Sequence, residues 1–183
     1  MFAILAAMPL MLLLGAAAPP SAVQYAADGQ LKLPENYREW VFLSSGLGMT
    51  YGPAAEGAET RPPMFDNVFV NPESYRAFLE TGKWPDKTLF VLEIRASASH
   101  VSINKTGHSQ GEVIAIEAEV KDSSKPGLWT FYEFPGGKAF PRTASCYECH
   151  GKNAAVENTF VQFYPTLYPV AEKKGTVNPG FKK

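Results

Sequence analysis

Five short apolar runs constrain the fold of this chain more than any other feature of its sequence. They are rich in β-branched and aromatic residues, and clusters of Gly, Pro, Asn and Asp separate them, which is typical of strands. The runs span residues 40–43, 67–70, 88–95, 112–121 and 128–134. Because the connections lack repeated crossover helices, we expect an α+β, mostly β fold built on an antiparallel sheet of about five strands.

Few helices are expected around this sheet. Asn71 is a good N-cap, proline follows it, and Gly82 can end a helix, so the sequence predicts a helix over 72–81. A second helix is expected to carry the cysteine motif, with Thr143 or Ser145 as its cap, and residues 155–164 are expected to form the last one, ended by Pro165.

The two ends of the chain differ from its middle. The first eighteen residues are uncharged and almost wholly apolar, which suits the hydrophobic part of a secretory signal peptide. We expect residues 1–27 to be a signal peptide and linker, residues 31–170 to be one domain, and residues 171–183 to be a flexible tail. A retained membrane anchor is the alternative, although the apolar run is short for a spanning helix of roughly 20 residues. A signal peptide predicts a periplasmic location.

Both cysteines of the chain lie in one pentapeptide, Cys146-Tyr-Glu-Cys149-His150. Thiols three positions apart lie about one helical turn apart. They can therefore add to two vinyl groups on one porphyrin edge, while the adjacent imidazole points to the iron. A thioredoxin-like dithiol would need a surrounding βαβ pattern, and a zinc site would need a fourth ligand. The motif predicts one covalent haem c on Cys146 and Cys149, with His150 as the proximal iron ligand, in a C-terminal attachment helix.

The sixth coordination position of the iron separates electron transfer from ligand binding. No Met or His follows His150, and the upstream candidates are Met49, Met64, His100 and His108. The methionines lie in Gly/Pro-rich stretches and the histidines flank a turn-like stretch, so ordinary packing or exposure is expected for each. We therefore expect five-coordinate iron with an open distal side.

The chain resembles the cytochrome P-460 family, which includes cytochrome c′-beta. The resemblance covers about residues 31–168. It rests on LPENYREW at 33–40, VNPESY at 70–75, VKDS at 120–123, the late cysteine motif, and FVQFYP at 160–165. It implies a mostly antiparallel β fold, often dimeric, with one c-type haem, His150 as proximal ligand and a vacant distal site.

The resemblance also divides the possible functions. Members that oxidise hydroxylamine carry a haem crosslinked to a lysine, whose matching position here is Leu92; the nearest lysine, Lys87, lies five residues earlier. Leucine cannot form that bond, so the resemblance favours the cytochrome c′-beta branch, which binds nitric oxide or carbon monoxide in an apolar pocket. A redox enzyme acting on hydroxylamine or a similar nitrogen compound and an electron-transfer cytochrome remain the alternatives, so enzymatic activity stays open.

Four apolar residues are expected at the distal pocket: Leu92, Phe65, Phe69 and Phe90. Aromatic side chains there would exclude water and leave a bound gas without hydrogen-bond donors, which favours nitric oxide over dioxygen. Plain core packing is the alternative for each phenylalanine.

Charged residues complete the expected site. Glu117 matches a pocket carboxylate of the hydroxylamine-oxidising branch. If Glu117 faces the haem, burial should raise its pKa and make it a candidate proton relay. The alternative is that Glu117 is an ordinary solvated carboxylate on a strand. Arg38 and Arg95 are candidates to pair with haem propionates. The net charge of −1 gives no basic excess for nucleic acid. The expected partners are a small gas or nitrogen oxide, a redox protein, and a second copy of the chain.

Overall fold

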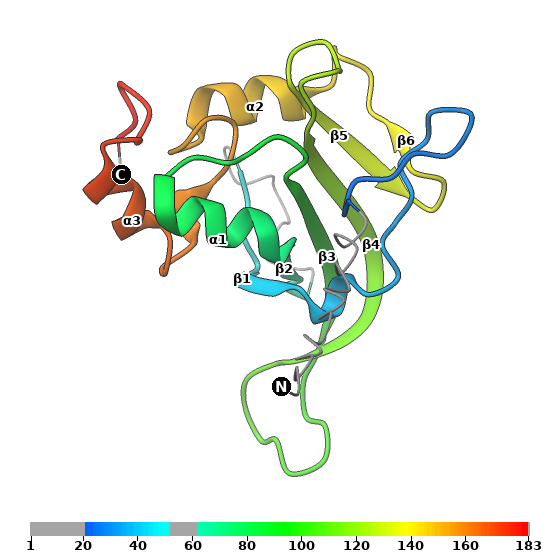
Figure 1. Ribbon diagram of the computed structural model, residues 1–183. Coiled ribbons are helices and arrows are strands. Elements are labelled where there is room, and N and C mark those ends of the chain that lie inside the picture. The colour runs from blue at the N-terminus through cyan, green and yellow to red at the C-terminus, as the bar shows by residue number, and fades with distance from the viewer. Residues whose placement is uncertain (1–20, 52–61, 183) are drawn as a thin grey trace, which may run out of the picture.

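A single antiparallel sheet forms the body of the protein in the computed structural model, which describes residues 21–51 and 62–182 (Figure 1). Its strands lie side by side in chain order. They are β1 (Val41–Leu47), β2 (Phe65–Val70), β3 (Leu89–Ala98), β4 (Ser109–Lys121), β5 (Trp129–Phe134) and β6 (Lys138–Ala139). The mostly β, antiparallel prediction is confirmed. The additional strand, β6, is two exposed residues long, too short to give a periodic signal.

Short helices accompany the sheet. They are η1 (Tyr37–Glu39), α1 (Pro72–Thr81), α2 (Ser145–Asn153), η3 (Val161–Phe163) and α3 (Tyr168–Lys174). Helix α1 has the predicted bounds, and Gly82 ends it in the left-handed conformation at φ 71°. The expected helix over 155–164 is wrong. Thr159 donates hydrogen bonds from its backbone and its hydroxyl to the Val156 carbonyl, which closes a tight loop instead.

The two faces of the sheet carry different side chains, because side chains alternate along each strand. Cross-strand pairing aligns Leu92 with Glu117, and Glu119 with both Phe90 and Phe131. These five residues lie on one face, which we call the helical face because α1, α2 and α3 pack against it.

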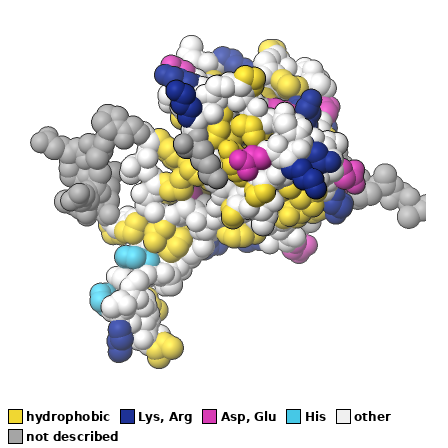
Figure 2. Space-filling model, turned by 90° about the vertical axis from the view of Figure 1, so that its left-hand side faces the viewer, with side chains coloured by type: hydrophobic (Ala, Val, Ile, Leu, Met, Phe, Trp, Pro, Cys, Tyr) yellow, Lys and Arg dark blue, Asp and Glu magenta, His cyan; other side chains and the backbone are white. Residues whose placement is uncertain are grey.

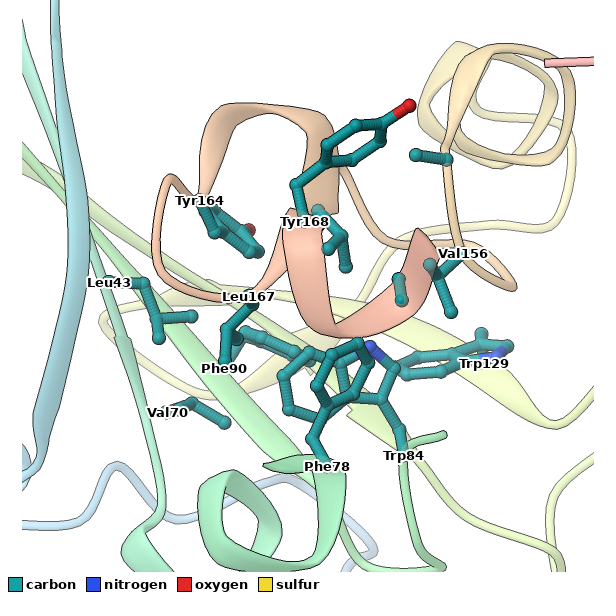
Figure 3. Packing of buried hydrophobic residues seen from close by; sticks show 13 residues of the cluster. Leu43, Val70, Phe78, Trp84, Phe90, Trp129, Val156, Tyr164, Leu167 and Tyr168 are labelled. Carbon is teal, nitrogen blue, oxygen red and sulfur yellow. The ribbon is translucent and has the colours of Figure 1, made fainter. Parts of the chain in front are cut away.

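The main core fills the space between the helical face and helices α1 and α3 (Figure 3). Trp84 is buried in it, with its ring centroid 4.1 Å from that of Phe78 and 4.8 Å from that of Phe90. Leu167 is fully buried beside them. Burial of this much apolar and aromatic surface fixes the position of the C-terminal helices relative to the sheet.

The opposite face is covered by the N-terminal segment. Val23 and Leu31 are buried against Leu89 and Val120. The Tyr25 hydroxyl donates a 2.8 Å hydrogen bond to Asp122. Residues 21–27, which were predicted to belong to a linker, are therefore part of the folded body, because Val23 and Tyr25 pack on this face of the sheet.

The C-terminal end is also part of the body. The predicted tail boundary at residue 171 falls inside α3, whose Ala171 is fully buried. The Phe181 ring lies 6.3 Å from that of Tyr168, and Asn178 is hydrogen-bonded to the loop after α2. The sequence offers little sign of these contacts because it is rich in lysine here. The charged residues Glu172, Lys173 and Lys174 are all exposed.

One segment projects from the body. The hairpin between β3 and β4 extends away from the sheet, and Figure 2 shows histidine side chains on it. Within residues 21–51 and 62–182, no helix has the length and apolar character to cross a membrane. The predicted signal sequence lies outside the described residues.

Candidate functional site

Helix α2 presents the cysteine motif toward the helical face of the sheet. Cys146, Cys149 and His150 are half-buried, whereas Ser145 and Glu148 on the other side of the helix are exposed. Neither cysteine forms a disulfide. Two thiols and an imidazole therefore share one side of a nine-residue helix, as the sequence predicted from their spacing.

The imidazole of His150 is held in one orientation. Its Nδ1 lies 2.7 Å from the carbonyl oxygen of Asn158. Its ring packs between Phe131, at 4.5 Å between centroids, and Phe160, at 4.2 Å. Donation of the Nδ1 proton to a backbone carbonyl leaves Nε2 with a free lone pair, which is the state in which histidine binds a metal.

A buried carboxylate lies behind this ring. Oε1 of Glu119 is 3.5 Å from His150 Nδ1, beyond the shorter Asn158 contact, and it has no hydrogen-bond partner among the described residues. Burial raises the pKa of Glu119, and the nearby imidazole only partly opposes this. Burial alone would lower the pKa of His150, but the Glu119 carboxylate and the Asn158 carbonyl outweigh it and raise that pKa.

Further carboxylates lie on the same face. Glu117 is cross-strand to Leu92 and to Glu133. Burial, followed by repulsion from Glu133 and Asp66, raises the pKa of Glu117, and burial raises that of Asp66. The structure thus brings Glu117 and Leu92 onto the face of His150, and the partial burial of Glu117 raises its pKa in the expected direction. Its role as a proton relay stays a prediction.

The three phenylalanines expected at the distal pocket are not brought together. Phe90 lies on the helical face but is only 4% exposed, and it is packed among core aromatics. Phe69 points to the other face, where its ring contacts Tyr37 and Phe42. Phe65 shares that side of β2 by alternation. The sequence assigned these rings to one pocket because it did not reveal which side of β2 faces α2.

The two arginines considered for propionates lie on the opposite face as well. Arg38 and Arg95 both bind the carboxylate of Glu93, which is 2% exposed and also accepts a hydrogen bond from Tyr37. Their guanidinium groups therefore hold η1 and β3 together instead of lying with His150. Burial would raise the pKa of Glu93, but these donors lower it.

The candidates for a sixth ligand lie in different places. His100 and His108 are exposed on the projecting hairpin, and Met64 is 46% exposed. Met49 is half-buried and occupies the space beside Gly46 of β1, and its sulfur lies 3.9 Å from the Tyr51 hydroxyl.

Several residues at the site were not selected from the sequence. Phe131, Phe160 and Glu119 surround the imidazole, and Asn158 acts through its backbone. Alternation along β4 places Glu119 on the side of Glu117, which was the only available signal. Any residue type can supply a backbone carbonyl, so the sequence could not predict the role of Asn158.

The donor set and its surroundings fit a haem. The thiols are unpaired, the imidazole presents Nε2, and a buried carboxylate oxygen without a partner faces Nδ1. An antiparallel sheet with these groups on a helix packed against one of its faces is the arrangement of a haem-binding cytochrome of the β-sheet type.

The chain belongs to the cytochrome P460 family, whose family model matches residues 34–161. The match includes every strand and α2, and leaves α3 and the C-terminal segment outside it. No curated protein sequence matches the chain significantly.

Proposed function

We propose that this protein is an exported, periplasmic cytochrome with one covalent haem c and an open distal position that binds a small neutral gas, nitric oxide foremost. The observation that carries the proposal is the shared side of α2, on which Cys146 and Cys149 lie beside an imidazole whose Nδ1 is already hydrogen-bonded. When bound, haem supplies an iron centre with one coordination position available to a ligand.

The protein's own residues hold and tune this centre. Asn158 fixes the His150 imidazole through Nδ1, and Phe131 and Phe160 prevent the ring from turning. A hydrogen-bonded imidazole is a more basic ligand than a free one. These contacts fix the direction of the His150 imidazole, which would hold the haem iron, and would raise its basicity as a ligand.

The charges of the helical face favour neutral ligands. Glu133 and Asp66 lie close enough to Glu117 to help raise its pKa, after burial. Their combined negative potential would oppose the entry of anions such as nitrite or azide, and would not affect an uncharged diatomic gas. Leu92 adds an apolar side chain on this face without a hydrogen-bond donor.

Hydroxylamine oxidation receives less support. The position matched by the crosslinking lysine is Leu92. Lys87 forms an ion pair with Asp122, and Lys121 binds Glu157 and the Trp84 carbonyl. Neither of these two amines is directed toward α2's thiols, so we favour gas binding over the redox enzyme.

Covalent attachment is tested by producing the protein with a c-type maturation system and examining denatured protein for haem. The wild type should keep its pigment on the polypeptide. Cys146→Ala with Cys149→Ala should lose it, and Tyr147→Phe in the same helix should keep it. A wild-type polypeptide without pigment would overturn the proposal.

Ligand binding is tested by optical and resonance Raman spectra of the same preparation. A five-coordinate high-spin spectrum that changes with nitric oxide supports an open position. A six-coordinate low-spin spectrum would indicate an electron carrier with a protein ligand, for which Met49 is the first residue to substitute. Turnover of hydroxylamine with an electron acceptor would instead establish the redox enzyme.

Export and self-association are proposed with it. Mass spectrometry of protein from the periplasmic fraction should show a chain shortened at its N-terminus, and sedimentation should show a homodimer. A redox partner would be expected only if the iron cycles between oxidation states.

A further inference from the structure

The loop after α2 determines where the His150 imidazole points. Asn158 supplies the carbonyl that accepts the Nδ1 proton, and it lies between Glu157 and Thr159. Glu157 has a positive φ of 50°, a conformation that a residue with a side chain adopts only when its surroundings enforce it. Contacts from outside the loop must therefore fix it.

One residue of the C-terminal segment makes most of these contacts. The amide oxygen of Asn178 accepts a 3.0 Å hydrogen bond from Glu157 N–H, and its amide nitrogen donates to the carbonyls of Ala154 at 2.9 Å and Glu157 at 2.8 Å. Its backbone N–H donates to the carbonyl of Ala155 at 2.7 Å. A single side chain thus satisfies both the N–H and the carbonyl of the residue with positive φ.

The other side of the loop is anchored on the sheet body. Trp84 Nε1 donates a 2.8 Å buried hydrogen bond to the Thr159 hydroxyl. Lys121 forms a 2.6 Å ion pair with Glu157. The peptide that carries the Asn158 carbonyl is therefore fixed on both flanks, by the core through Thr159 and by the C-terminal segment through Glu157.

We infer that Asn178 is a positioning residue for His150: it fixes Glu157, and thereby the Asn158 carbonyl, against the imidazole. The inference rests on the proposed ligation of haem iron by His150. It assigns a role in the site to a segment outside the family match, which ends at residue 161. Donors and acceptors behind a metal-bound histidine commonly set its orientation and basicity.

The test compares haem-loaded wild type with Asn178→Ala. Loss of the side chain releases Glu157, which weakens the Nδ1 hydrogen bond and makes the imidazole a weaker donor. The iron–histidine stretching band of the ferrous protein should move to lower frequency, and the reduction potential should rise, because a weaker donor stabilises ferric iron less.

The matched control is Thr176→Ala. Thr176 lies two residues earlier in the same segment and bonds only the carbonyl of Ala171 in its own helix end, so its loss loosens the segment without releasing the loop. It should lower thermal stability and leave the band and the potential at wild-type values. If Asn178→Ala yields no folded protein, Asn178→Asp replaces it, because that side chain keeps the acceptor for Glu157 N–H and loses the donor to the two carbonyls.

The possible results separate this inference from the function on which it rests. A wild type without an iron–histidine band would overturn the ligation and the inference together. A normal wild-type band that stays unchanged in the Asn178 variants, or that shifts equally in Thr176→Ala, would overturn the inference alone.

Discussion

Replacement of Asp122 by Asn should destabilise the protein at neutral pH, and the loss should be smaller in acid. The Asp122 carboxylate is fully buried at the end of β4. It accepts hydrogen bonds from the Tyr25 hydroxyl at 2.8 Å, from the Ser124 N–H at 2.9 Å, and from the ammonium of Lys87. It therefore joins the N-terminal segment, the start of β3 and the turn after β4.

The magnitude follows from these contacts. Each hydrogen bond to a charged group contributes about 1.5–3 kcal/mol to the free energy of unfolding. Removing one charge of a buried ion pair costs most when the remaining charge stays buried. Lys87 is 39% exposed and can turn to water, so the loss is reduced. We expect Asp122→Asn to lower the free energy of unfolding by roughly 2–4 kcal/mol, or to lower Tm by roughly 5–15 °C.

The pH dependence has a definite sign. Burial alone would raise the pKa of Asp122, but the donors hold it well below its ordinary value of 3.8. A carboxylate with a depressed folded pKa stabilises the protein above its unfolded pKa and loses this contribution as the pH falls through the folded value. The difference between wild type and variant should thus shrink by about 1 kcal/mol between pH 7 and pH 3.

Urea unfolding followed by circular dichroism at both pH values measures this difference. Asp28→Asn is the control, because Asp28 is exposed and accepts only a turn hydrogen bond from Gln30. Its effect should stay below about 1 kcal/mol at either pH. An Asp122→Asn protein as stable as wild type at pH 7, or a difference that does not narrow in acid, would refute the reasoning.

Three further predictions concern the core and the site. Leu167→Ala removes a fully buried side chain and should cost about 2–5 kcal/mol of unfolding free energy in a urea titration. Trp84→Phe removes the buried donor to the Thr159 hydroxyl and should cost about 2–4 kcal/mol, with a smaller loss in Thr159→Ser, which keeps that acceptor. Glu117→Gln removes a negative charge and should raise the affinity of the haem-loaded protein for azide roughly two- to tenfold. The affinity for carbon monoxide should stay unchanged, and optical titration measures both. An equal change for both ligands would contradict the charge argument.

The strands and the helix that carries the cysteine motif were predictable because their signals are local. The runs at 88–95 and 112–121 became β3 and β4, and the Asn71-Pro72 start and Gly82 end bounded α1 correctly. Local signals failed where partners from distant parts of the chain decide the conformation. Residues 155–164 have no strong helix breaker, yet hydrogen bonds from Trp84 to Thr159 and between Asn178 and Glu157 hold the first half of the segment in an irregular loop.

The candidate site was predictable only in part, for a related reason. The cysteine motif fixes chemistry within five residues, so Cys146, Cys149 and His150 needed no tertiary information. Which aromatic rings surround these residues depends on which face of the sheet the odd-numbered and even-numbered side chains of each strand point to. Phe65 and Phe69 lie on the side of β2 away from the helical face, whereas Phe131 and Phe160 lie beside the imidazole.

The contacts of the N-terminal segment limit how the chain can be shortened without harm. Val23 lies in the smaller apolar cluster and Tyr25 reaches Asp122, so a processed form starting at Ser21 retains both. A form starting after Ala27 would expose the apolar surface of Leu89 and Val120 to water and leave Asp122 with one donor fewer. The N-terminal sequence of the protein as isolated would therefore show whether the face of the sheet opposite the helical face is covered.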